Sequence, residues 1–333
     1  MSDLTLLLAV LAVLLSLARA SGSAAARLGQ PAVIGEIACG LLVGVAMDTG
    51  PELPGRVGTT LDALAQLGLT LFLFCVGARL APSMTERRVR AALVPALGAI
   101  VVPVVLGALL ALWLARRHAP AGVTPFVLFA AAAMAVTAFP VLARILAERD
   151  MLDDAGGQRA LSAAAITDAA AWTALAFVAA SLHEGIRLWS LALTVALLVA
   201  LCRLARPWFG RLAARLPRQT TVAILVSLAC AGAATTELAG LHSAVGAFLT
   251  GVAVGRSAHR IEPATLVAPV GALLVPLYFV LVGRRVDLGG LDLLLVAETA
   301  AVIAVAVAGK CGGPTSAPAS PGNRPTRPRS SPP

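Results

Sequence analysis

Charged side chains are scarce in this sequence. Asp, Glu, Lys and Arg make up 13% of its 333 residues, whereas about 25% is usual for a soluble globular protein. Aromatic residues are scarcer still, at 4%, while hydrophobic residues reach 59% and the mean hydropathy is +0.88. This composition excludes an ordinary soluble domain. The net charge of +9 does not indicate a nucleic-acid surface, because the Arg residues lie in short segments between apolar runs.

The sequence also lacks the patterns of enzymes and metal proteins. Its five Cys residues are isolated, with neither CxxC nor CxxH spacing, so packing explains them better than a disulfide framework or a zinc site. No phosphate-binding glycine loop, nucleophile elbow or metal cluster is present. An intramembrane enzyme is disfavoured, and we expect no cofactor and no metal other than a transported ion.

Long apolar runs dominate the chain, and each is long enough to cross about 30 Å of hydrocarbon as a helix. Because Asp3 but no Lys or Arg precedes the first run, we interpret it as a retained span and not as a signal peptide. We expect a polytopic all-α membrane protein with eleven spans: 3–19, 29–48, 61–80, 91–115, 123–147, 159–182, 187–204, 219–236, 241–256, 265–283 and 291–311.

Arginine is concentrated in alternate loops. This bias predicts an N-terminus outside and a C-terminus in the cytoplasm of a cell inner membrane, with Arg116 and Arg117 as the main exceptions.

An internal repeat links the two halves of the chain. LFLFCVGARL (71–80) and LYFVLVGRRV (277–286) both end in Gly-x-Arg, with Gly77 answering Gly283. They are seven spans apart and so enter the membrane in opposite senses, as in the inverted repeats of many secondary transporters. The glycines at 35, 40 and 44 and at 246, 251 and 255 are typical of close helix packing.

The chain changes character after its last span. Residues 312–333 are rich in Pro, Ser, Gly and Arg and cannot form a membrane helix, so we expect a transmembrane domain over 1–311 and a disordered tail over 312–333. Three spans follow the first copy of the repeated segment, but only 291–311 follows the second copy, so two spans are missing. We therefore interpret the second repeat as incomplete and the tail as the product of a truncation or a frameshift.

The strongest functional pattern combines a proline and a carboxylate. Pro140 inside span 123–147 predicts a break near Thr137–Pro140, which frees backbone carbonyls and amides at the midplane. Asp168 follows in the next span, roughly 12 Å beyond Ala160 at about 1.5 Å per residue.

A buried carboxylate beside unwound backbone can hold a dehydrated cation when ionised or a proton when neutral, so the two ligands compete for one site. The alternative is a structural pair between Asp168 and an arginine such as Arg144.

Other intramembrane charges are weaker candidates. Glu36 fits helix packing or a dimer domain as well as function, and Glu298 has no visible partner in the sequence. Glu237 and His242 flank a turn at Gly240.

TAFPVLARILAERDML followed by SAAAITDAAAW resembles the core of the cation:proton antiporter-2 family, the sodium/proton-exchanger-type transporters. GQPAVIGEIACGLLVG, TELAGLHSAVGAFLTGVAVGR and VPLYFVLVGRRVDL are similar to further family segments, so the resemblance runs from about residue 25 to 311. It implies a scaffold or homodimer domain, a mobile core with two crossed broken helices, and exchange of Na⁺ or K⁺ for H⁺.

The resemblance implies that Asp168 binds the cation and the proton, and that Thr137, Phe139 and Pro140 lie in the broken-helix crossover. Lys310 matches a basic residue that pairs with the carboxylate in part of the family.

Two departures from the family pattern matter. Many members have Asp or Asn before the binding Asp, whereas Thr167 supplies a hydroxyl that can coordinate a cation but cannot carry a second charge, which favours electroneutral exchange. The second broken helix is absent.

We thus expect a cation:proton antiporter, with a non-transporting degenerate fragment or an accessory membrane subunit as the alternative. Lys310 and Arg144 are candidate charge partners at the site.

Overall fold

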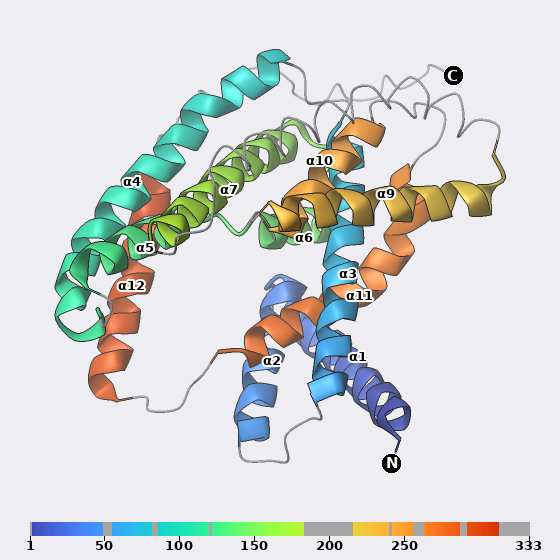
Figure 1. Cartoon of the computed structure of the whole chain (residues 1–333), viewed down its shortest axis with the longest axis horizontal. Coiled ribbons are helices and arrows are strands. Elements are labelled where there is room, and N and C mark those ends of the chain that lie inside the picture. Colours follow the sequence, from blue (N-terminus) through green and yellow to red (C-terminus); the bar gives the residue numbers. More distant parts are fainter. Residues whose placement is uncertain are drawn as a thin grey trace, which may run out of the picture.

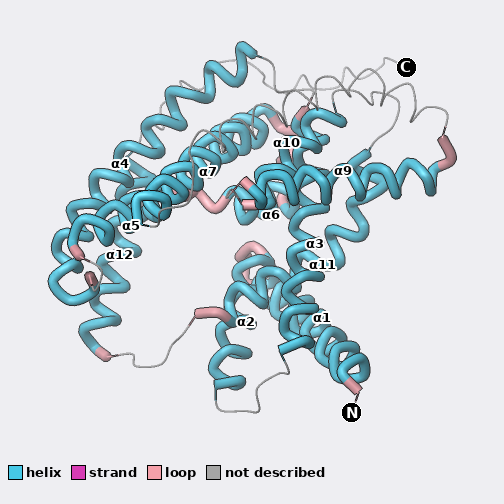
Figure 2. The backbone as a smooth tube through the Cα atoms, in the orientation of Figure 1, coloured by secondary structure: helices cyan, strands magenta, loops and turns pink. Residues whose placement is uncertain are grey.

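The protein is helical throughout the part that the structure describes (Figure 2). This computed structural model describes residues 2–48, 55–81, 86–119, 122–182, 216–239, 242–255, 263–286 and 292–312, and no strand occurs in these ranges. The expected span 187–204 and residues 313–333 of the expected tail lie outside the described residues.

Each predicted span within the described ranges coincides with helix to within a few residues, except that the helices of the first and third runs extend up to eight residues beyond those runs. The helices are α1 (Asp3–Arg27), α2 (Ala32–Asp48), α3 (Gly55–Leu80), α4 (Glu86–His118), α5 (Val123–Ala135), α6 (Phe139–Glu148), α7 (Ala155–Leu182), α9 (Arg218–Leu238), α10 (Ser243–Gly255), α11 (Pro263–Arg284) and α12 (Leu293–Gly312).

Seven segments among the described helices are long and apolar enough to cross a membrane, counting α5 and α6 as one, and two shorter apolar helices lie at Ala32–Ala46 and Ser243–Gly255. Large apolar side chains remain exposed along one stripe of α4, at Leu97, Val101, Val105, Leu109 and Leu112. Such a stripe suits a helix whose outer face contacts lipid. The chain is a multi-pass membrane protein.

The helices form two groups, which lie on opposite sides of Figure 1. One contains α1, α2, α3, α9, α10 and α11, and the other contains α4, α5, α7 and α12. Helix α6 lies between them: it packs against α7 on one side and against α2 and α3 on the other. The ten-residue helix α6 is therefore a main bridge between the two groups.

The glycines of the repeat lie at close helix contacts. Gly77 of α3 faces the backbone of α10 at Phe248, and Gly283 of α11 faces the backbone of α2 at Ile37. A side chain at either glycine would overlap the opposite carbonyl oxygen. Each copy of the repeated segment thus packs on a glycine-rich partner helix, α10 or α2.

Helices α3 and α11 also pack directly on each other in opposite directions. Gly68 faces Leu274, and six residues earlier in α3 Asp62 pairs with Arg285, with 3.0 Å between Oδ1 and Nη2. The antiparallel course agrees with the opposite membrane senses expected for an inverted repeat.

Candidate cation-binding site

The helix break predicted at Thr137–Pro140 is present. Helix α5 ends at Ala135, Val136 is extended (φ −55°, ψ 132°), and Ala138 adopts a left-handed conformation (φ 49°, ψ 58°) before α6 begins at Phe139. The cause lies in Pro140, which has no N–H and whose ring would clash with the carbonyl four residues earlier if the helix continued. In the first turn of α6 the missing donor costs nothing.

Helix α7 brings a buried acidic and hydroxyl pair to this break. Asp168 and Thr167 are 6% and 1% exposed. The hydroxyl oxygens of Thr167 and Thr137 are 2.9 Å apart, and the Thr167 hydroxyl also donates to the carbonyl of Ala164 in its own helix. The hydroxyl bridge joins α7 to the non-helical link between α5 and α6.

Lys310 completes the site from α12. Its ammonium donates to the carbonyl of Ala135 at 2.8 Å, to the Thr137 hydroxyl at 3.1 Å and to the carbonyl of Ala99 at 3.5 Å. Ala135 is the last residue of α5, where the helix dipole presents its negative end. The ammonium also lies within electrostatic reach of the Asp168 carboxylate.

This arrangement can bind a small cation. A carboxylate, threonine hydroxyls and a carbonyl freed by unwinding are hard oxygen ligands, and half-helix carboxyl ends of this kind coordinate Na⁺ and H⁺ in transporters. The Lys310 ammonium already uses the Ala135 carbonyl and the Thr137 hydroxyl, which shows that these oxygens attract positive charge.

The remaining predicted residues lie close to the break or at some distance from it. The ring of Phe139 packs edge-to-face on Phe248 of α10, with 4.8 Å between the ring centroids. Arg144 is placed differently: its guanidinium pairs with Glu36 and Glu148, at 3.3 Å and 2.8 Å. Thr137, Thr167, Asp168 and Lys310 therefore come together, while Arg144 belongs to a second cluster.

Several polar pairs were not predicted from the sequence. Glu298 has a partner in His118, with 2.8 Å between Oε2 and Nε2, and Asp292 pairs with Arg117 at 3.0 Å. The pKa of Asp292 lies below its usual value. The main cause is the hydrogen bond that its carboxylate accepts from the backbone N–H of Leu295, and the hydrogen bond from the Arg117 guanidinium is the second cause.

One feature of the sequence indicates a special role for Lys310. It is the single lysine of the chain, in which all other side chains counted as basic at neutral pH are arginine. A compact ammonium on a flexible stem points three donors at oxygens in different directions, whereas the donors of a guanidinium lie in one plane.

Within the described ranges, no three His, Cys, Asp or Glu side chains gather as a resident metal site would require. The features assembled here define the class: a multi-pass helical membrane protein with a discontinuous helix and an intramembrane carboxylate and ammonium at the break.

Comparison with known proteins identifies the family. The family described as "Sodium/hydrogen exchanger, transmembrane" matches residues 10–313, and the chain belongs to it. It is a member of the cation:proton antiporters, as the sequence motifs predicted.

Named relatives come from three kinds of organism. The chain is 34% identical over 304 residues to Cation/H(+) antiporter 17 of Arabidopsis thaliana, covering 85% of this chain and 37% of that protein. It is 32% identical to Na(+)/H(+) antiporter NhaS4 of Synechocystis sp. over 336 aligned positions, 93% of this chain and 81% of the relative. It is 29% identical over 288 residues to K(+)/H(+) antiporter 1 of Saccharomyces cerevisiae, 78% of this chain and 33% of the relative. The chain thus spans about a third of the plant and yeast proteins.

Proposed function

We propose that this chain is a secondary active transporter that exchanges Na⁺ or K⁺ for H⁺ through one buried carboxylate, Asp168. The observation that carries the proposal is the meeting of Asp168 and Thr167 with the broken helix, whose Ala135 carbonyl already accepts a hydrogen bond from a cationic group. The named relatives include both Na(+)/H(+) and K(+)/H(+) antiporters, so the proposal covers both ions.

Exchange follows from competition at this site. When Asp168 is ionised, a dehydrated cation can bind it together with the Thr137 and Thr167 hydroxyls; when Asp168 is protonated, the electrostatic attraction for the cation is lost. The Lys310 ammonium acts as a tethered competitor, because it donates to the Ala135 and Thr137 oxygens that an arriving cation would use. We assign Phe139 and Pro140 to the crossover that shapes the site.

The proposal extends to location and assembly. We place the chain in a cell inner membrane, where the loop arginines favour an N-terminus outside and a C-terminus in the cytoplasm. We propose a homodimer and no enzymatic activity, cofactor or nucleic-acid partner.

The test is cation-driven proton flux in vesicles that contain the purified 333-residue chain. Asp168→Asn should abolish the flux, because the amide cannot bind a proton or neutralise a cation. Asp150→Asn is the matched control: Asp150 is exposed and has a positive φ of 54°, which Asn tolerates, so its flux should equal that of the parent chain. Unchanged flux in Asp168→Asn would remove Asp168 from the mechanism, and no flux in the parent chain would overturn the proposed activity.

A further inference from the structure

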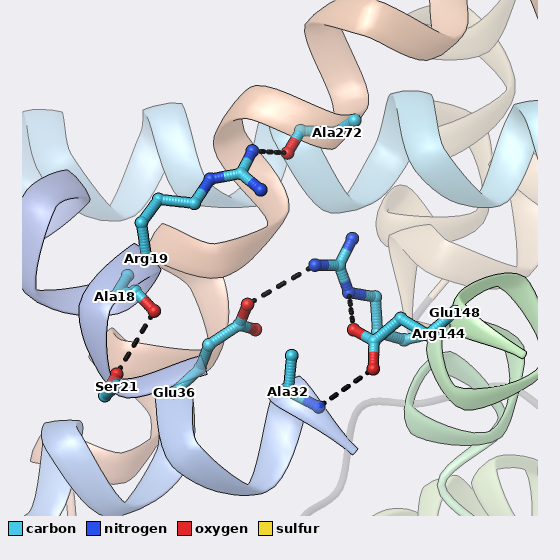
Figure 3. A network of polar contacts seen from close by, with 8 residues as sticks. All are labelled: Ala18, Arg19, Ser21, Ala32, Glu36, Arg144, Glu148 and Ala272. Atoms are coloured by element: carbon cyan, nitrogen blue, oxygen red, sulfur yellow. Dashed lines mark hydrogen bonds and ion pairs between the residues drawn. The ribbon is translucent and has the colours of Figure 1, made fainter. Parts of the chain in front are cut away.

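A second charge cluster joins α6 to α2, separate from the site at Asp168. Arg144 of α6 contacts Glu36 of α2 with 3.3 Å between Nη2 and Oε1, and contacts Glu148 with 2.8 Å between Nε and Oε1 (Figure 3). Glu36 is 1% exposed. The other oxygen of Glu148 accepts a hydrogen bond from the backbone N–H of Ala32, the first residue of α2, at 2.9 Å.

Charges of both signs surround Glu36. The groups that act on Glu36 are Arg144 and Glu148 from α6 and Arg19 from α1. The Arg19 guanidinium donates to the carbonyl of Ala272 in α11, at 2.9 Å, and forms no ion pair with Glu36 in Figure 3. Among the described side chains of α11 the charged one is Arg284, which lies beside Gly44, two turns along α2 from Glu36.

One guanidinium therefore pairs with two carboxylates, of which Glu148 is exposed and Glu36 is buried. A negative charge at Glu36 is costly, and a carboxyl group in this situation takes up a proton instead. Burial indicates which carboxyl is protonated: Glu148 is exposed and also caps α2, whereas Glu36 is 1% exposed.

The second oxygen of Glu36 is the atom at which a proton can bind. Oε2 is buried and has no hydrogen-bond partner among the described residues, while Oε1 faces Arg144. An ionised carboxylate would leave a charged oxygen without a donor at this position, which costs more than leaving a neutral group there.

We propose that Glu36 is a second proton-binding site, distinct from Asp168, and that its proton stabilises the packing of α2 on α6. With the proton bound, Arg144 and Glu148 form a neutral pair beside a neutral Glu36. When the proton leaves to water at higher pH, the buried Glu36 carboxylate carries a charge between the helices and this packing loses stability.

The position of α6 connects this proton to the cation site. Helix α6 begins at Phe139, directly after the break, and it bridges the two helix groups. Loss of the proton from Glu36 thus releases the half-helix that borders the cation site. This consequence for exchange rests on the function proposed above, whereas proton binding at Glu36 does not.

The first test is the thermal unfolding midpoint of the detergent-purified chain as a function of pH, without a cation gradient. The parent midpoint should fall as pH rises through the titration of Glu36, because a proton held more tightly by the folded chain is lost. Glu36→Gln, which mimics the neutral carboxyl, should lose this fall. Glu298→Gln, a buried carboxyl of α12 in another pair, should keep it. A Glu36→Gln chain that retains the parent pH profile would overturn the proposal.

If Glu36→Gln does not fold, Glu148→Gln provides a second test, in which the direction of the pH shift is predicted. Removal of the Glu148 charge leaves Glu36 as the sole carboxylate on Arg144, which favours the ionised form. The transition of the parent midpoint should therefore move to lower pH, by about one pH unit. No shift, or a shift to higher pH, would contradict the proposal.

Measurements of exchange distinguish a failure of this inference from a failure of the proposed function. Glu36→Gln should change the pH profile of exchange but keep its maximal rate, whereas Asp168→Asn should abolish exchange and keep the pH profile of unfolding. A parent chain without exchange whose unfolding still depends on Glu36 would leave the proton site standing and overturn only the transport proposal.

Discussion

At the scale of single residues, the candidate site depends on four side chains from three parts of the sequence. The proximity of Thr167 and Thr137 was predictable, because a carboxylate in an apolar run, a proline in the preceding run and the family resemblance all point to this region. The contacts of Lys310 were not predictable. Its acceptor carbonyl belongs to Ala135, 175 residues away, and every residue of the chain offers a carbonyl.

Lys310→Met tests the idea of a tethered competitor. The variant removes the donor from the Ala135 carbonyl and the Thr137 hydroxyl, so the free energy of unfolding should fall by about 1–3 kcal/mol. Cation affinity should rise, because the competing ammonium is gone. The measurements are denaturant unfolding in micelles and cation titration of the purified chain. Equal or weaker cation binding in Lys310→Met would contradict the competitor role.

At the scale of elements, the sequence predicts the helices well, since apolar runs of membrane length have one stable conformation in lipid. The break was also predictable, because Pro140 cannot continue the hydrogen-bond ladder of the helix. The left-handed conformation of Ala138 was not, because alanine has no preference for positive φ. The cluster of Glu36, Arg144 and Glu148 could not be predicted for a different reason: Glu36 is 108 residues from Arg144, and the sequence does not show which carboxylate the guanidinium pairs with.

Ala138→Gly should stabilise the chain by about 1 kcal/mol, because glycine adopts the left-handed conformation without steric cost. Ala143→Gly is the matched control in the same short helix: Ala143 is fully buried in regular α6, and the change should destabilise by about 1 kcal/mol. The free energy of unfolding in micelles measures both. A destabilised Ala138→Gly chain would show that the link is not strained at this residue.

At the scale of the whole molecule, two helix groups meet largely through α6. The repeat could be predicted from one pair of ten-residue segments, but its packing could not, because the sequence does not say which helix covers which glycine. The structure pairs each repeated segment with the glycine-rich helix of the other half, α3 with α10 and α11 with α2.

Gly40→Ala tests this packing. A methyl group on Gly40 would overlap the carbonyl oxygen of Val280 in α11, so the helices must separate, at a cost of about 1–3 kcal/mol in unfolding free energy. Gly58→Ala in α3 is the control. No atom lies within 4 Å of its added methyl group, and the change should stabilise by about 0.5–1 kcal/mol. If the two variants behave alike, the close contact of α2 and α11 is not a determinant of stability.

The central claim is that one carboxylate binds either a cation or a proton. The most direct measurement is proton release from the purified, weakly buffered chain when Na⁺ or K⁺ is added. The account predicts that the parent chain releases protons, that release saturates with cation concentration, and that Asp168→Asn releases none while Asp150→Asn behaves as the parent. Cation binding without proton release, or equal release from Asp168→Asn, would contradict it.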